Sequence, residues 1–301
     1  MRTPFVALLL MVAAIPALHA TEPEPAKAIL VTGASTGIGR NVTEHLAAAG
    51  YFVYAGARKP ADLEALGKIK NVQAIKLDVT KPEDISAAVD TVTKAGRGLY
   101  GLVNNAGVAS VGTATGIKFE EFDLIMHVNV YGPYRVTQAF APLIIASKGR
   151  ITTIGSIAGI VAPPPVSAYA MSKHAMEAFG DSLQGEMEPQ GVKVSLVEPG
   201  NYNSDLGKSA LARTGIAGRL TDRSKYKQPD EVAAAVALAL FEDNPKHRYM
   251  VTPNQDEAER TLRKQIAQLV ELNEGHAYTL DRDALVKMLD EALATARPKK
   301  P

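Results

Sequence analysis

The stretch Val31-Thr-Gly-Ala-Ser-Thr-Gly-Ile-Gly39 decides the fold of this 301-residue chain. It follows an apolar run over residues 28–32 and leads into a stretch with helical apolar spacing that ends at Gly50. Three glycines at such a junction allow a sharp turn and the close approach of a pyrophosphate to a helix N-terminus. A glycine triplet alone also fits a plain tight turn, but the strand before it and the helix after it favour dinucleotide binding.

Outward from this turn, short apolar runs alternate with amphipathic stretches, which is the pattern of a parallel sheet covered by helices on both faces. The runs that predict strands cover residues 28–32, 51–55, 72–77, 99–104, 150–154, 192–198 and 249–252. We therefore predict an α/β fold, a doubly wound, Rossmann-type parallel sheet of about seven strands with helices on both faces. The stretch Thr80-Lys-Pro-Glu83 has the form of a capping box and predicts a helix that ends near Gly96.

The chain divides into three parts. Residues 1–20 predict a signal peptide or an N-terminal membrane anchor, because Arg2 precedes an apolar run shorter than the ~20 residues that span a bilayer. Residues 26–252 form the predicted dinucleotide-binding domain, and its glycine-containing segment 201–228 predicts a mobile lid over the substrate. Residues 253–301 predict a C-terminal extension of two amphipathic helices, whose apolar faces pack on the same subunit or across a dimer.

Composition excludes several classes of chemistry. Lys plus Arg number 33 against 32 for Asp plus Glu, without a charged block, so no nucleic-acid partner is expected. The absence of cysteine excludes disulfides, thiolate nucleophiles and iron–sulfur clusters, and the six histidines show no His-Glu-x-x-His, so no metal is expected. Any redox chemistry therefore comes from oxygen, nitrogen or a cofactor.

Further motifs follow the glycine turn in order along the chain. They are Asn104-Asn-Ala-Gly107, Asn129, Ser156, Tyr169-x-x-x-Lys173 and Pro199-Gly200. With the spacing Thr-Gly-x-x-x-Gly-x-Gly in the turn, the chain resembles the short-chain dehydrogenase/reductase family over about residues 27–205. The resemblance implies a nicotinamide cofactor and the interconversion of an alcohol and a carbonyl.

The chemistry of the motif residues agrees with that expectation. Tyr169 and Lys173 are four residues apart, so on a helix they share a face. A free phenol loses its proton only near pH ~10 unless a cation stabilises its phenolate, and Lys173 is suited to be that cation. Ser156, after a strand, is suited to hold the substrate oxygen. The resemblance gives Asn129 the role of keeping a water against Lys173, which completes a predicted catalytic set of Asn129, Ser156, Tyr169 and Lys173.

The end of the second strand indicates which dinucleotide binds. An acidic side chain there takes the ribose hydroxyls of NAD, but Ala57 stands at this place and is followed by Arg58, whose planar guanidinium suits a phosphate. We therefore predict NADP(H), with NAD(H) less favoured, and Arg40 as a lesser second contact. The predicted cofactor-binding residues are Gly33, Ser35, Thr36, Gly37, Ile38, Gly39, Arg58, Asp78, Val79, Asn105, Ala106, Gly107, Tyr169, Lys173, Pro199, Gly200 and Ser204.

The substrate is predicted from the segments that border the nicotinamide. Residues 160–166 and the apolar positions Tyr202, Leu206, Leu211 and Ile216 favour a lipophilic alcohol, ketone or aldehyde. The expected function is that of an NADP(H)-dependent oxidoreductase with Tyr169 as general acid/base. The alternative is a catalytically silent nicotinamide-binding sensor or docking protein.

Assembly and location are also expectations at this stage. Apolar residues on the helix that carries Tyr169 predict core packing or a subunit interface, and we expect a homodimer or a homotetramer. A cleaved leader would place the protein in a periplasm or an endoplasmic reticulum lumen. A retained leader would associate it with a membrane and leave the domain facing the cytoplasm.

Overall fold

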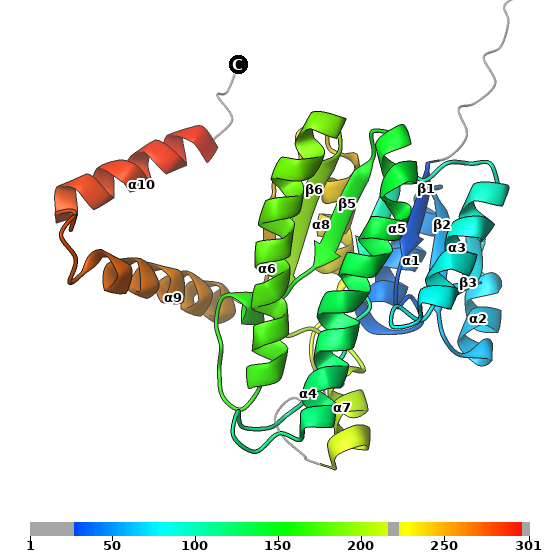
Figure 1. Cartoon of the computed structure of the whole chain (residues 1–301), viewed down its shortest axis with the longest axis horizontal. Coiled ribbons are helices and arrows are strands. Elements are labelled where there is room, and N and C mark those ends of the chain that lie inside the picture. The colour runs from blue at the N-terminus through cyan, green and yellow to red at the C-terminus, as the bar shows by residue number, and fades with distance from the viewer. Residues whose placement is uncertain (1–26, 216–222, 297–301) are drawn as a thin grey trace, which may run out of the picture.

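The computed structural model describes residues 27–215 and 223–296, and it confirms the predicted parallel sheet (Figure 1). The strands in this part of the chain pair in the order β3-β2-β1-β4-β5-β6-β7, all parallel. The order reverses between β1 and β4, and ligands of such sheets bind at this point, beyond the carboxyl ends of the strands. The strands are β1 (Ala28–Val31), β2 (Phe52–Ala57), β3 (Val72–Lys76), β4 (Gly101–Asn104), β5 (Arg150–Ile154), β6 (Lys193–Pro199) and β7 (Arg248–Val251).

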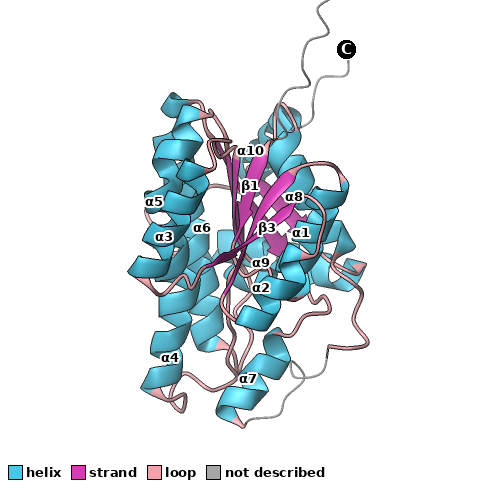
Figure 2. Cartoon of the chain, turned by 90° about the vertical axis from the view of Figure 1, so that its right-hand side faces the viewer, coloured by secondary structure: helices cyan, strands magenta, loops and turns pink. Residues whose placement is uncertain are grey.

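Helices cover both faces of the sheet (Figure 2). One face carries α1 (Gly37–Ala48), α2 (Pro60–Gly67) and α8 (Asp230–Phe241), and the other carries α3 (Pro82–Lys94), α5 (Gly132–Ala146) and α6 (Ser167–Met187). Alternate residues of β1 enter the two apolar cores that result, Ile29 and Val31 on the α1 side and Leu30 on the α5 side. Both faces of the strand are buried, which explains why the sequence shows continuous apolar runs rather than alternation.

The start of α3 differs from the predicted capping box. Lys81 is the residue that caps the helix, and its side chain makes no capping bond. The Thr80 hydroxyl instead donates a 2.7 Å hydrogen bond to Asp78 Oδ1. In the first turn, Asp84 Oδ2 accepts a hydrogen bond from the Asp78 backbone N–H at 3.2 Å. The prediction was wrong because a nearby aspartate competes for the threonine hydroxyl.

Two connections shape the carboxyl edge of the sheet. The helix α4 (Phe119–Met126) continues through a single π-helical turn, His127–Tyr131, into α5. After β6, the helix α7 (Leu206–Thr214) occupies part of the predicted lid, so residues 206–214 are not the irregular segment that the glycines suggested. No helix among the described residues is long and apolar enough to cross a membrane. The predicted leader and the Ile216 position lie outside the described residues.

The C-terminal extension consists of α9 (Gln255–Asn273) and α10 (Arg282–Ala296), which project away from the sheet (Figure 1). Leu262 is 54% exposed and Ile266 is 61% exposed on α9, and Leu289 on α10 is 59% exposed. Of the two predicted alternatives, packing on the same subunit is therefore not what the structure shows, and packing across a dimer stays a prediction. The physical reason is that α9 leaves from β7, the last strand of the sheet, and extends beyond its edge. Only the start of α9 is buried, at Glu257 and Thr261.

Candidate active site

The glycine turn between β1 and α1 forms one end of the site. Gly33 and Gly37 adopt left-handed backbone conformations, with φ angles of 64° and 55°, which glycine tolerates best. A Cβ atom on Gly39 would lie 2.3 Å from both the Gly33 carbonyl oxygen and Asn105 Nδ2. Gly33 and Gly37 are therefore required for their backbone conformation, and Gly39 is required because there is no space for a side chain.

The motif after β4 holds this turn in place. Asn105 Nδ2 donates hydrogen bonds to the carbonyl oxygens of Thr32 at 2.8 Å and Gly33 at 3.1 Å. The backbone N–H groups of Asn105 and Ala106 both donate to the Thr32 hydroxyl at 3.0 Å. Two strands adjacent in the sheet but distant in sequence are thereby joined at the N-terminus of α1. The free N–H groups of that helix end and the absence of side chains at the glycines fit a dinucleotide pyrophosphate.

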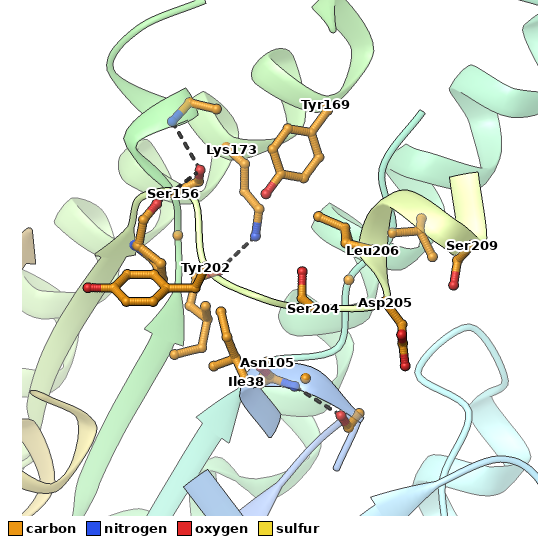
Figure 3. Close-up of a pocket in the computed structure, with 18 of the residues that line it drawn as sticks. Ile38, Asn105, Ser156, Tyr169, Lys173, Tyr202, Ser204, Asp205, Leu206 and Ser209 are labelled. Atoms are coloured by element: carbon orange, nitrogen blue, oxygen red, sulfur yellow. Dashed lines mark hydrogen bonds between the residues drawn. The ribbon is translucent and has the colours of Figure 1, made fainter. Parts of the chain in front are cut away.

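Three of the predicted catalytic side chains lie at the opposite end of the site, Ser156 just after β5 and Tyr169 and Lys173 on α6. Figure 3 shows the Tyr169 hydroxyl and the Lys173 amine directed into the same space, with Ser156 beside them. Lys173 Nζ lies 5.7 Å from the centre of the Tyr169 ring and donates a 2.7 Å hydrogen bond to the Ile154 carbonyl oxygen. Lys173 is only 6% exposed, so this bond fixes a nearly buried ammonium next to the half-buried tyrosine.

Asn129 lies behind these residues rather than on the cavity surface. It sits in the π-helical turn and is 2% exposed. Its Oδ1 accepts from the Val108 backbone N–H at 2.8 Å, and its Nδ2 donates to the Val108 carbonyl and to Ser172 Oγ, both at 2.9 Å. The Ser172 hydroxyl in turn donates to the Tyr169 carbonyl oxygen at 2.7 Å. The Asn129 amide therefore holds the start of α6 in place through Ser172. Ser172 was not identified from the sequence as part of this hydrogen-bond chain.

The end of β2 carries the residues that we predicted to distinguish the two dinucleotides. Ala57 is buried, and the exposed Arg58 that follows it lines the cavity. Asp78 and Val79, after β3, line the same region. The predicted second contact, Arg40, does not line the cavity because its Nε pairs with Glu44 Oε1 one helical turn away. No acidic side chain stands at position 57, so this end of the cavity has no charge at that position that would repel a phosphate.

A single cavity of about 1140 Å³ brings the two ends together. This volume exceeds the range of about 300–1000 Å³ common for one small ligand, so it has room for a cofactor and a substrate. Every predicted cofactor residue except Arg40 lines it, and so do three of the four predicted catalytic residues; Asn129 and the apolar Leu211 do not. The apolar walls of the cavity include Val111, Val161, Ala162, Pro163, Pro164, Pro165, Val166 and Leu206.

Several polar residues of the cavity were missed by sequence reasoning. Glu257, Arg260 and Lys264 come from the start of α9, and Arg213 from α7 also lines the cavity. Arg213 pairs with Glu121 Oε1 at 3.2 Å and so joins α7 to α4. The spacing of three and four residues between the α9 side chains was visible in the sequence. Nothing in the sequence placed that helix next to the site.

The strand β6 carries a buried carboxyl group next to the cavity. Glu198 on β6 is 2% exposed and precedes the predicted cofactor residue Pro199. Burial raises the pKa of Glu198 to about 8, and the neighbouring carboxylate of Glu177 adds to the rise. Arg248 Nε lies 3.4 Å from Glu198 Oε1 and offsets part of it. At neutral pH this carboxyl group is therefore largely protonated.

Comparisons with known proteins agree with this geometry. The family model described as short chain dehydrogenase matches residues 27–214. The rat mitochondrial D-beta-hydroxybutyrate dehydrogenase is 39% identical over 186 residues, which cover 58% of this chain and 54% of that protein. The matched region thus spans about half of that relative's length.

Two solved structures share the fold. A short-chain dehydrogenase from Streptomyces avermitilis superposes with a TM-score of 0.73 and 30% identity, covering 84% of this chain and 96% of that one. An alcohol dehydrogenase from Thermococcus sibiricus, complexed with 5-hydroxy-NADP, gives a TM-score of 0.66 and 27% identity over 75% and 96% of the two chains. The chain therefore belongs to the short-chain dehydrogenase family of oxidoreductases.

Proposed function

We propose that the protein is an NADP(H)-dependent oxidoreductase that interconverts a lipophilic alcohol and the corresponding ketone or aldehyde. The observation that carries the proposal is the meeting of Tyr169, Lys173 and Ser156 at one end of a cavity whose other end is the glycine turn. This arrangement brings a proton donor, a cation and a second hydroxyl to the place where a nicotinamide ring and a substrate would meet. A bound nicotinamide would supply or accept the hydride.

The side chains of the site orient the substrate and transfer the proton. The Ser156 hydroxyl orients the substrate oxygen, since its Oγ is itself held by a 3.0 Å hydrogen bond from the Ala158 backbone N–H. The Tyr169 hydroxyl gives its proton to the carbonyl oxygen in reduction and takes it back in oxidation. The Lys173 ammonium, fixed by the Ile154 carbonyl, stabilises the phenolate that this transfer leaves. Asn129 acts as a positioning residue through Ser172.

The preference for NADP(H) is supported by the end of β2. The guanidinium of Arg58 is exposed to the cavity and has no acidic neighbour at position 57, so it is available to a 2′-phosphate. The Thermococcus relative, whose structure contains an NADP derivative, supports the same choice. Asp78 borders the adenosine side, where its Oδ1 already accepts from the Thr80 backbone N–H at 3.0 Å.

The lipophilic substrate is supported by the walls between the catalytic residues and the lid. Val161 and Val166 stand before α6, Leu206 begins α7, and all three line the cavity that contains Tyr169. Apolar groups around a carbinol carbon presented to Tyr169 would also exclude water from the reacting atoms.

Turnover tests the proposal. The purified full chain is incubated with NADPH and a panel of ketones and aldehydes, or with NADP⁺ and secondary alcohols, while nicotinamide absorbance is followed. We expect turnover of at least one lipophilic substrate, and less than about a tenth of that rate with the Tyr169→Phe variant. Firm NADPH binding without turnover across the panel would contradict the proposal and favour a silent nicotinamide-binding protein.

A further inference from the structure

Two basic side chains on α9 line the cavity on its substrate side. Arg260 and Lys264 are four residues apart and share a helix face with Glu257, which lies one turn earlier. Glu257 is buried, and its Oε2 accepts a 2.8 Å hydrogen bond from the Asn201 backbone N–H. A Cβ atom on Gly200 would lie 2.2 Å from the same oxygen, so the glycine lets the helix approach. The first turn of α9 is thereby fixed at the cavity, and the basic pair with it.

The two basic side chains have no direct partner in the described part of the chain. Both are exposed, and neither the Arg260 nor the Lys264 side chain forms a hydrogen bond or an ion pair within residues 27–215 and 223–296, although Glu257 lies on the same helix face. Arg263 on the same helix differs, since it lies outside the cavity and pairs with Glu259 Oε1 at 2.6 Å. Like charges four residues apart on a helix repel each other weakly, and an anion bound between the two side chains would relieve that repulsion.

The ribose phosphate of the cofactor would lie too far from the basic pair to be the anion that binds there. Arg58, which suits the ribose phosphate, follows β2, whereas α9 follows β7, and four strands separate these two in the sheet. Neighbouring strands are about 4.8 Å apart, so the end of β2 and the end of β7 are separated by roughly 24 Å. The other substrate-side cations already have partners: Arg213 pairs with Glu121, and Arg223 donates to the Tyr202 carbonyl at 3.5 Å.

We infer that the substrate carries an anionic group at the end of an apolar body, and that Arg260 and Lys264 bind this group. The inference rests on the proposed function, because it places the carbinol carbon at Tyr169 and the apolar body along Val161 and Leu206. Carboxylate and phosphate share the required chemistry, since both accept charge-assisted hydrogen bonds from guanidinium and ammonium groups. The basic pair is thus a specificity-determining site supplied by the C-terminal extension.

Binding tests this inference without requiring turnover. Calorimetry compares octanoate, octyl phosphate and the uncharged octanamide on the wild type, on Arg260→Gln/Lys264→Gln and on the control Arg263→Gln, with and without NADPH. We expect at least one anion to bind the wild type and the control with the same affinity. Its affinity for the double variant should be lower by at least roughly tenfold. Octanamide binding should be weak and equal in all three proteins. The stronger anion identifies the group. Equal anion affinities in all three proteins would overturn the inference.

A kinetic comparison separates this inference from the proposed function. The ratio of kcat/KM for a keto fatty acid to that for its methyl ester should exceed roughly ten in the wild type and fall toward one in the double variant, because kcat/KM for the acid falls. Anion binding that depends on the pair, without any turnover, would remove the proposed function alone. Turnover without preference for the acid would remove this inference alone. Loss of binding to phosphatidylglycerol vesicles in the double variant, with octanoate binding unchanged, would assign the pair to a membrane surface and overturn it.

Discussion

Asn105 holds Gly33 from across the sheet: its Nδ2 donates a 3.1 Å hydrogen bond to the Gly33 carbonyl oxygen and a 2.8 Å bond to that of Thr32. The end of β4 therefore sets the shape of the turn after β1. The same amide group closes the space above Gly39, where an added Cβ would lie 2.3 Å from it. A single side chain thus links the two glycine-containing motifs that the sequence presents as separate.

We expect Gly39→Ala to weaken NADPH binding severely and to lower the free energy of unfolding by about 1–3 kcal/mol, because the Gly33 carbonyl oxygen that the Cβ would meet is backbone and cannot rotate away. Thermal unfolding and NADPH titration measure both effects. Gly185→Ala on α6 is the matched control: its Cβ would meet nothing within 4 Å, and alanine in a helix interior should stabilise by about 0.5–1 kcal/mol. Equal NADPH affinity in the two variants would contradict the account.

We expect Tyr169→Phe to lose more than about nine-tenths of turnover while folding normally and binding NADPH, because the phenyl ring keeps the packing and removes only the proton. Tyr134→Phe, at a side chain 54% exposed on α5, serves as the control and should retain full activity. A residual rate above about a tenth of the wild type, a barrier change below ~1.4 kcal/mol, would exclude Tyr169 as the general acid/base.

We expect the wild type to prefer NADPH over NADH by roughly ten- to a hundredfold, and Arg58→Ala to lose most of this preference. A charge-assisted contact to the 2′-phosphate of ~1.5–3 kcal/mol accounts for this range, and it should weaken with added salt. Fluorescence titration of both dinucleotides provides the affinities. Lys59→Ala removes a neighbouring cation that does not line the cavity and should leave the ratio unchanged. An unchanged ratio in Arg58→Ala would remove that residue from its assigned role.

We expect the stability of the wild type to decrease between pH 5 and pH 8 because of Glu198. Its pKa is raised to about 8 in the folded protein from an ordinary 4.5, so over this range the folded state keeps a proton that the unfolded state releases. The stabilisation is complete below the ordinary pKa and is lost as the pH rises through the raised one. Glu198→Gln removes this titration, and the variant should gain on the order of 2–4 kcal/mol relative to the wild type from pH 5 to pH 8.

Thermal unfolding of both proteins across that pH range checks the Glu198 prediction. The neighbouring charged groups Glu177, Asp181 and Arg248 are retained in the variant, so the difference between the two curves reports Glu198 together with its interaction with Glu177. Parallel curves for the wild type and Glu198→Gln would show that the carboxyl group is ionised in the folded protein throughout, contrary to the expectation.

We expect the mature protein to begin near Thr21 and to occur in a soluble fraction, because the apolar run of residues 5–18 ends before a small residue at position 20. Cell fractionation followed by N-terminal sequencing measures this. A protein that retains Met1 and sediments with membranes would instead identify the leader as an anchor.

The sequence by itself determined those features that depend on residues close together in the chain. Strands buried on both faces appear as continuous apolar runs, and a strand–glycine–helix junction is contiguous in the chain, so the sheet and the turn were predictable. Tyr169 and Lys173 were placed together by helical spacing alone, and the cavity contains both. These features depend on residues a few positions apart, whose geometry is set by the backbone.

What only the tertiary structure decided depends on elements that meet from distant parts of the chain. The capping of α3 was mispredicted because Asp78 competes for the Thr80 hydroxyl. The raised pKa of Glu198 comes from its burial and from carboxylates on α6, against the opposing effect of Arg248 on β7. The exposure of the apolar face of α9 follows from the direction in which that helix leaves β7. That direction also brings Arg260 and Lys264 to the cavity. Helix amphipathicity specifies which faces are apolar or charged, but only the packed fold determines what each face meets.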